Sequence, residues 1–174
     1  MVAPIRSLLF ATNLSEECKP ALAASVAAAA QHRAELVLLH VVDREVPTQV
    51  EEHFKGVLGE EKWKALKEEH EQDARQALIG KMSPGQIGQK VMRNYCEEAG
   101  INVEACEFNW HEVVVADRNI PNTIIDQVKK FGCNMIVMGS DKGFFGGNSV
   151  GSTIKGVLRK SRVPVLVVPP WGES

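Results

Sequence analysis

The stretch that most constrains the fold of this chain is residues 134–170, which reads NMIVMGSDKGFFGGNSVGSTIKGVLRKSRVPVLVVPP. An apolar strand is expected at 135–138, then a glycine-rich loop, a helix beginning at Ser152, and a second apolar strand at 165–168. This order brings unpaired backbone N–H groups and the positive end of a helix dipole to one point. The stretch therefore predicts a phosphate-binding site, with a merely compliant glycine connection as the alternative.

The N-terminal part of the chain predicts a strand, a helix and a second strand. The apolar runs at 5–12 and 36–42 flank a helix expected from about 17 to 32, with Ser15 as its cap. Such a βαβ unit has parallel strands and a right-handed crossover. With a further strand favoured at 111–116, the alternation predicts a parallel sheet that binds ligands at the carboxyl ends of its strands.

The middle of the chain leaves alternatives open. Residues 43–59 are interpreted as a polar connection, and the strongly charged run 60–81 as a surface helix whose charges face solvent. A shorter helix is expected to end near residue 99, with Gly100 as its stop. The stretch 101–108 (INVEACEF) also has a strand-like pattern, either as part of one interrupted strand with the next segment or as an edge hairpin.

The third and last crossover helices are defined by local signals at their ends. Pro121 is expected in the first turn of a helix that Gly132 ends. In the final helix, Ile154, Val157 and Leu158 are expected to form the buried side.

Length and composition favour one globular domain over residues 1–174, with an insertion of an extra helix and strand at about 82–110. The formal net charge of -2 provides no basic surface for nucleic acid. The sequence contains no apolar run near the ~20 residues that a membrane span needs, and its first residues have the pattern of a strand. We therefore expect a cytoplasmic protein that binds neither nucleic acid nor membrane.

The cysteines and His40 predict no metal or catalytic centre. The four cysteines are scattered without a C-x-x-C pair, which argues against a disulfide framework or a zinc site and favours ordinary core thiols. His40 is a possible ligand, but a hydrogen-bonded structural role is favoured because no other ligand stands at a metal-binding spacing. No nucleophile is placed beside a base, so we predict no catalytic residues.

Three segments together resemble the universal stress protein family: ATNLS, LLHVVD and IVMGS…GS…PVLVVP. The resemblance covers nearly the whole chain. It implies an α/β three-layer sandwich, adenine nucleotide alpha hydrolase-like, with a five-stranded parallel sheet ordered 3-2-1-4-5 and helices on both faces. It also implies a homodimer formed through the C-terminal strand from Val163 to Val168, which would otherwise be an exposed edge.

Nucleotide-binding members of that family carry the signature G-x2-G-x9-G-[S/T]. The resemblance therefore implies an adenine nucleotide, ATP or AMP, with or without Mg²⁺. It places Met138, Gly139, Ser152 and Thr153 on the phosphate and ribose side, and the backbone of Val41 against the adenine. The complete implied site is Thr12, Asn13, Val41, Met138, Gly139, Ser140, Lys142, Gly143, Gly151, Ser152 and Thr153.

The sequence departs from the family pattern at two points. Gly151 lies twelve positions after Gly139, where the signature has thirteen, and Lys142 stands where the second glycine is expected, with Gly143 next to it. Lys142 could itself reach a phosphate as a point charge. In addition, Asn13 replaces an acidic residue that accepts bonds from both ribose hydroxyls, whereas an amide has one accepting and one donating group.

These features support a nucleotide-binding regulatory protein of the stress response. The alternative is a universal stress protein that binds no nucleotide and acts as a dimeric adaptor for protein partners. An enzyme of similar topology would carry an S-G-G-x-D type loop after the first strand, and ATNLS does not supply it. We therefore expect no enzyme, with at most slow ATP hydrolysis.

Overall fold

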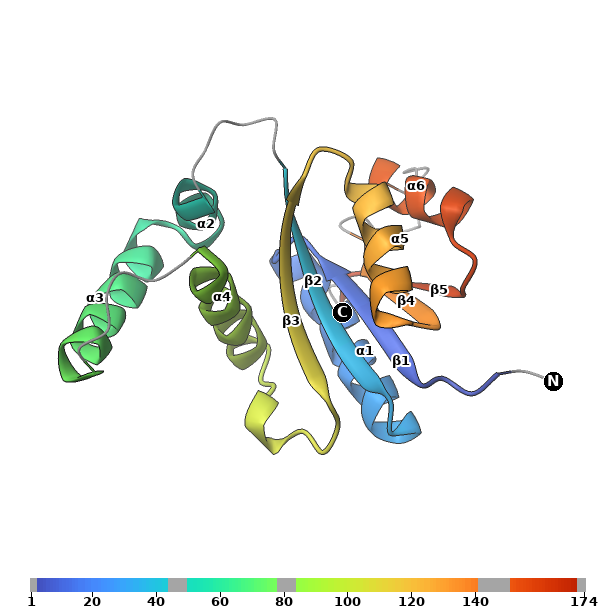
Figure 1. Ribbon diagram of the computed structural model, residues 1–174, viewed down its shortest axis with the longest axis horizontal. Helices are drawn as coiled ribbons and strands as arrows, with labels where there is room; N and C mark the ends of the chain where they lie inside the picture. Colours follow the sequence, from blue (N-terminus) through green and yellow to red (C-terminus); the bar gives the residue numbers. More distant parts are fainter. Residues whose placement is uncertain (1–2, 44–49, 78–83, 141–150, 172–174) are drawn as a thin grey trace.

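Five parallel strands form one sheet in the computed structural model, which describes residues 3–43, 50–77, 84–140 and 151–171 (Figure 1). The strand order is β3-β2-β1-β4-β5, as predicted. The strands are β1 Ser7–Thr12, β2 Glu35–Asp43, β3 Trp110–Asp117, β4 Met135–Gly139 and β5 Val165–Val168.

The central strand β1 sets the position of any ligand. Every residue of β1 is buried, and it pairs in parallel with β2 on one side and β4 on the other. From β1 the chain adds β2 and β3 in one direction, then returns to add β4 and β5 in the other. Loops that leave the sheet on opposite sides of such a reversal diverge, and a crevice opens at the carboxyl ends of the strands.

Helices cover both faces of the sheet, which gives the predicted three layers. The α1 and α4 side chains pack with Leu8 and Phe10 on one face, while those of α5 and α6 pack with Leu9 and Ala11 on the other. The helices are η1 Glu16–Cys18, α1 Lys19–His32, α2 Val50–Leu58, α3 Glu60–Ala77, α4 Pro84–Glu98, η2 Val103–Ala105, α5 Ile120–Phe131 and α6 Ser152–Lys160.

Helix ends follow local chemistry, with one correction. Asn119 caps α5 by accepting a hydrogen bond from the backbone N–H of Asn122 at 3.1 Å, and Gly132 ends that helix at φ 64°. Ser15 was predicted to cap the first helix. It occupies the cap position of η1 but makes no capping bond through its side chain, and its backbone N–H donates to the Oδ1 of Asn13.

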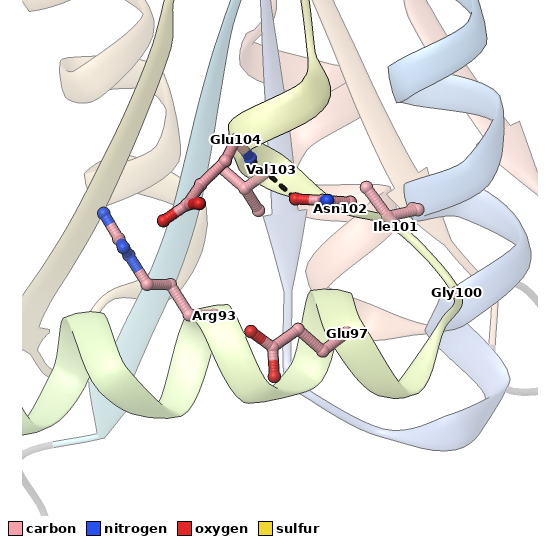
Figure 2. A pocket seen from close by; sticks show the side chains of 7 residues that line it. All are labelled: Arg93, Glu97, Gly100, Ile101, Asn102, Val103 and Glu104. Atoms are coloured by element: carbon pink, nitrogen blue, oxygen red, sulfur yellow. Dashed lines mark hydrogen bonds between the residues drawn. The ribbon is translucent and has the colours of Figure 1, made fainter.

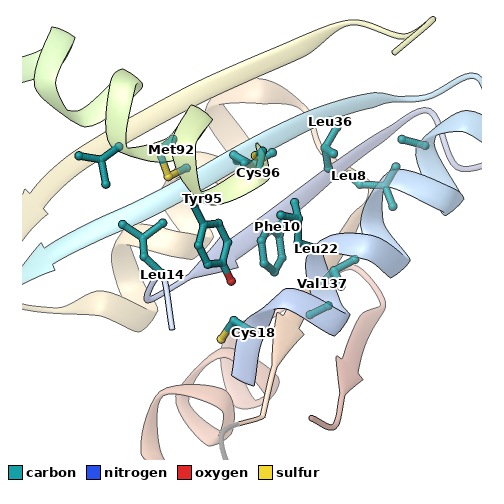
Figure 3. Close-up of a cluster of buried hydrophobic side chains, with 14 of the residues drawn as sticks. Leu8, Phe10, Leu14, Cys18, Leu22, Leu36, Met92, Tyr95, Cys96 and Val137 are labelled. Atoms are coloured by element: carbon teal, nitrogen blue, oxygen red, sulfur yellow. The ribbon is translucent and has the colours of Figure 1, made fainter. Parts of the chain in front are cut away.

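The α1 and α4 face contains an aromatic core (Figure 3). Phe10 lies between α1 and Tyr95 of α4, and Phe54, Trp63 and Leu66 are buried in the same cluster. Phe54 belongs to α2, so the prediction of a polar connection over 43–59 is wrong for its second half. The helix forms there because Phe54 is fully buried against the core, and hydrophobic burial outweighs the polar composition around it.

The predicted extra strand near 82–110 is also wrong. Residues 101–108 contain η2, and Asn102 accepts a bond from the N–H of Glu104 at 3.0 Å, which stabilises a turn. Ile101 and Phe108 pack against the aromatic core, so their apolar pattern reflects contacts of an irregular segment. The helix of that region, α4, lies in the crossover between β2 and β3 and covers β3.

Two further sequence expectations have clear outcomes. The described cysteines are all free thiols, and three of them are buried, as expected for core residues. Leu158, predicted to lie on the buried side of α6, is 50% exposed, whereas Ile154 and Val157 are buried. Ile154 and Val157 belong to the apolar cluster on this face of the sheet, and Leu158 does not. None of the described helices is long and apolar enough to cross a membrane.

Candidate functional site

A cavity of about 260 Å³ opens at the carboxyl ends of β1, β2 and β4, where α6 begins. The structure brings most of the predicted site residues together around it: Thr12, Asn13, Val41, Met138, Gly139, Gly151, Ser152 and Thr153. The cavity therefore lies at the reversal of strand order, where ligands of doubly wound sheets bind. We refer to it as the crevice.

The remaining predicted residues lie elsewhere. Ser140 is buried and its backbone N–H donates to the carbonyl of Val168 at 2.8 Å, which extends the pairing of β4 with β5. It does not line the crevice. Lys142 and Gly143 lie outside the described residues.

The first turn of α6 lines the crevice, and the described residues give it no side-chain cap. Gly151 occupies the cap position with no side-chain cap, and its carbonyl accepts the first helical bond from Lys155 at 3.0 Å. The N–H groups of the first turn have no partner within a helix by construction. A Cβ added at Gly151 would meet no atom within 4 Å, so neither packing nor backbone strain demands glycine there. The missing side chain instead leaves the helix end open to an anion.

Gly139 has a different requirement. A Cβ on this residue would lie 2.8 Å from the Sγ of Cys18 and 3.0 Å from its Cα, a distance that real Cβ atoms rarely show. The bare Cα of Gly139 lets the end of β4 approach η1. Glycine is therefore needed at this position for packing, independently of any ligand.

The bend after β1 is held by hydrogen bonds between side chains and backbone. Leu14 has a positive φ of 65°, and its N–H donates to the Oγ1 of Thr12 at 2.9 Å. The Oδ1 of Asn13 accepts from the N–H of Ser15 at 3.0 Å and from the Sγ of Cys18 at 3.1 Å. A non-glycine residue in the left-handed region persists only where its surroundings fix it, so Thr12 and Asn13 have a fixed orientation.

Two side chains from neighbouring elements support this bend from behind. The Nδ1 of His40 lies 2.9 Å from the carbonyl oxygen of Thr12, and its ring contacts that of Phe54, which confirms the predicted structural role of this histidine. Tyr95 of α4 donates from its hydroxyl to the carbonyl of Ser15 at 2.9 Å, and its burial raises the pKa of the phenol. The bend is therefore preorganised on the side away from the crevice.

Apolar side chains form a large part of the crevice wall. Sequence reasoning missed these residues, except for Val41: Leu39, Ile120 and Ile124, together with Ala11, Cys18 and Ile154. Ile120 and Ile124 begin α5 directly after β3, so their position at a carboxyl end of the sheet could have identified them. An apolar wall together with the amides of a helix N-terminus suits a ligand with a hydrophobic group and an anionic group.

The described crevice residues supply hydrogen-bond donors and apolar surface but no acid or base. Their polar side chains are those of Thr12, Asn13, Cys18, Ser152 and Thr153. Among the residues with described positions, no group of three His, Cys, Asp or Glu side chains is arranged to hold a metal ion. These groups can bind a ligand that has an apolar part and an anionic part, but they offer no carboxylate or imidazole for catalysis.

A larger cavity of about 450 Å³ lies between α4 and η2 (Figure 2). The carboxylates of Glu97 and Glu104 and the guanidinium of Arg93 line it, and the side-chain oxygen of Asn102 is already bonded to the N–H of Glu104. Two carboxylates beside one guanidinium oppose a phosphate. This cavity is therefore less suited to an anion than the crevice, although it is larger.

A doubly wound parallel sheet with a helix N-terminus in its switch-point crevice defines a class of α/β proteins suited to phosphate-containing ligands. Comparison with known families gives a more specific answer. The model of the universal stress protein family matches residues 4–169, and the chain belongs to this family. A search of curated proteins gave no match.

Solved structures of universal stress proteins share the fold. UspA from Lactobacillus plantarum is 21% identical, with 96% of this chain and 99% of that chain covered and a TM-score of 0.56. A universal stress protein in complex with cAMP is 14% identical, with coverage of 97% and 100% and a TM-score of 0.59. One from Archaeoglobus fulgidus in complex with dAMP is 14% identical, with coverage of 95% and 98% and a TM-score of 0.55.

Proposed function

We propose that this chain binds an adenine nucleotide, ATP or AMP, in the crevice and acts as a regulatory protein of the stress response. The observation that carries the proposal is the uncapped first turn of α6, which begins at Gly151 and faces the cavity beside the end of β1. The cAMP and dAMP complexes of structurally similar proteins support an adenine nucleotide as the ligand.

The proposed ligand runs across the ends of three strands. Its phosphate lies at the amides of Ser152 and Thr153, and its adenine lies against Leu39 and Val41 at the end of β2. Because β1 stands between β2 and β4, the sugar lies near Asn13. Lys142 and Gly143 are proposed to complete the phosphate side, and Mg²⁺ would accompany a triphosphate.

Binding without turnover is the proposed activity, apart from slow ATP hydrolysis. The crevice residues that the structure describes include no carboxylate or imidazole to activate water. His40 is buried with its ring against the carbonyl of Thr12. A measured ATP turnover well above about one per second, which is within the ordinary enzyme range, would contradict this part of the proposal.

The proposed assembly is a homodimer that pairs through β5. This strand bonds to β4 on one side and is the last strand of the sheet on the other. Leu166 on β5 is 39% exposed and Trp171, which follows it, is 71% exposed. An open strand edge with apolar side chains favours pairing across a two-fold axis. Light scattering should give twice the chain mass for the wild type and a lower mass for Leu166→Lys.

The same surface supports the second candidate function, a dimeric adaptor that binds proteins and no nucleotide. Exposed apolar residues at a sheet edge are typical of interaction sites. This function predicts that the purified chain carries no nucleotide and that substitutions in the crevice leave partner binding unchanged.

The experiment that separates the two functions is a nucleotide assay with one crevice variant. One portion of the purified protein is denatured, and the supernatant is analysed for adenine nucleotides. A second portion, which has not been denatured, is titrated with ATP and AMP. Gly151→Asp places a carboxylate at the helix N-terminus, where it competes with the phosphate, and should weaken binding about a hundredfold or more.

The matched control is Gly56→Asp, which introduces the same side chain on α2 at a glycine that also has no atom within 4 Å of its Cβ position. It should bind nucleotide like the wild type. The proposal is wrong if the wild type binds nothing at millimolar ATP, or if Gly151→Asp binds as tightly as the control.

A further inference from the structure

The side-chain amide of Asn13 has a fixed orientation in the crevice wall. Its Oδ1 lies 3.0 Å from the backbone nitrogen of Ser15 and 3.1 Å from the Sγ of Cys18. A backbone N–H can only donate, so the atom that faces Ser15 must be the oxygen and not the nitrogen. These two hydrogen bonds therefore fix Oδ1 as the atom that faces the bend, and Nδ2 is left for a ligand.

The consequence is that the accepting half of Asn13 is fully used by the protein. A carbonyl oxygen has two lone pairs, and the N–H of Ser15 and the thiol of Cys18 occupy both. Asn13 is exposed and lines the crevice, and among the described residues its Nδ2 makes no hydrogen bond. The group that remains for a ligand is an uncharged donor with two hydrogens.

This donor stands at the middle of the crevice. Val41 of β2 lines the crevice on one side of β1, and Met138 of β4 with the start of α6 lines it on the other, while β1 and its bend lie between β2 and β4. A nucleotide that spans both sides presents its sugar to the bend. In the proposed pose, Asn13 therefore faces the secondary oxygens of the ribose.

We propose that Asn13 is a specificity-determining residue that favours a nucleotide with a phosphoryl ester on a secondary ribose oxygen over one with a free 2′,3′-diol. The inference rests on the proposed nucleotide function. A ribose hydroxyl both donates and accepts, and Asn13 can only donate to it, in a bond between uncharged groups. A phosphoryl oxygen only accepts, so it pairs with the Nδ2 hydrogens in a charge-assisted bond, and no carboxylate repels it.

Asn13→Asp converts the site with little change in shape. One carboxylate oxygen would keep the bonds to Ser15 and Cys18, and the other would face the sugar as a charged acceptor. The probes are 3′,5′-cyclic AMP and 5′-AMP, whose dissociation constants are measured by calorimetry for both proteins. We expect the wild type to bind cyclic AMP at least as tightly as AMP, and the variant to shift the affinity ratio toward AMP by about tenfold or more.

Asn102→Asp is the matched control, because the Oδ1 of Asn102 also accepts from the backbone N–H two residues further on, that of Glu104 at 3.0 Å, and Asn102 does not line the crevice; it should retain the wild-type ratio. The inference is overturned if Asn13→Asp leaves the ratio unchanged, or if Asn102→Asp shifts it as far as Asn13→Asp does. In either case AMP binding itself still supports the proposed function. If neither nucleotide binds to the wild type, the proposed function fails and this inference fails with it.

Discussion

The two faces of the sheet differ in what fills them. The face under α1 and α4 is packed with large aromatic side chains, among them Phe10, Phe54 and Trp63. The face under α5 and α6 is mainly aliphatic, with Leu9, Ile136 and Val157 at its centre, and it leaves the crevice open where those helices begin. The comparison indicates that the first face supplies stability while the second supplies the space for a ligand.

The bend after β1 joins the two faces. Its backbone is bonded from the aromatic side by His40 and Tyr95, while Asn13 lies in the wall of the crevice on the other side. A rigid support behind a binding group lowers the entropy that is lost when a ligand binds. Substitutions on the aromatic face should therefore change stability far more than affinity, as long as they leave this bend intact.

The largest expected effect is that of Phe54→Ala. This side chain is fully buried, and its removal should lower the free energy of unfolding by about 3–5 kcal/mol. Chemical denaturation measures the loss, and AMP affinity of the folded protein should stay near the wild-type value. Val57→Ala on the same helix removes a side chain that is 38% exposed and should change stability by less than about 0.5 kcal/mol. Equal effects of the two variants would mean that α2 is not part of the core.

Gly139→Ala should destabilise the protein by about 1–3 kcal/mol, because the new Cβ collides with Cys18 at the junction of the two faces. Gly56→Ala is the control, since it meets no atom in helix α2 and should stabilise the protein by about 0.5–1 kcal/mol. The two substitutions are chemically identical, so the opposite signs isolate the close approach of β4 to η1. Denaturation midpoints that move in the same direction would contradict it.

Asn119→Ala should cost about 1 kcal/mol, because it removes the cap of α5 on the crevice side of the sheet. Ser15 occupies a cap position without a capping bond, and its buried hydroxyl has no hydrogen-bond partner in the described structure. The control substitution is Ser15→Ala. This second change should cost less than about 0.5 kcal/mol. A larger loss for Ser15→Ala, measured by thermal unfolding, would restore the capping role that the sequence predicted.

The smallest effect concerns Glu112, whose side chain is 8% exposed on β3. Burial raises the pKa of this carboxyl above its usual range, although Arg93, with its Nε 3.5 Å from the carboxylate, opposes the rise. The folded state therefore prefers the protonated acid. Protonated Glu112 contributes to the free energy of unfolding below the ordinary pKa, and this contribution is lost as pH rises through the higher pKa of the folded state. Glu112→Gln should gain stability relative to the wild type as pH rises from the ordinary pKa of a glutamate, 4.5, through the raised pKa of Glu112. A difference in melting temperature that is constant across this range would contradict the raised pKa.

The sequence predicted the crevice side of the molecule more completely than the aromatic side, for a physical reason. Strands β1, β2, β4 and β5 are short apolar runs between clear turn or helix-cap signals, and α5 is bounded by Pro121 and Gly132. Their patterns are local. The helix α2 depends on one deeply buried residue, Phe54, within a polar segment, and only the tertiary contact reveals it.

The segment after α4 shows the converse error. The alternating apolar residues at 101–108 have the period of a strand, but β3 already occupies that edge of the sheet and these residues form η2 instead. Within the site, the resemblance to the universal stress protein family predicted which positions meet at the crevice. It could not predict the orientation of the Asn13 amide, because that orientation depends on the Ser15 N–H and the Cys18 thiol that only the folded bend brings together.

The most direct test of the central claim is to follow backbone amide resonances of the protein while 5′-AMP is added. The account predicts that the amides of Ser152 and Thr153 shift with ligand concentration, while those of Asn102 and Glu104, in the larger polar cavity, stay in place. Shifts confined to Asn102 and Glu104, or saturation of no resonance at millimolar AMP, would contradict a nucleotide site at the start of α6.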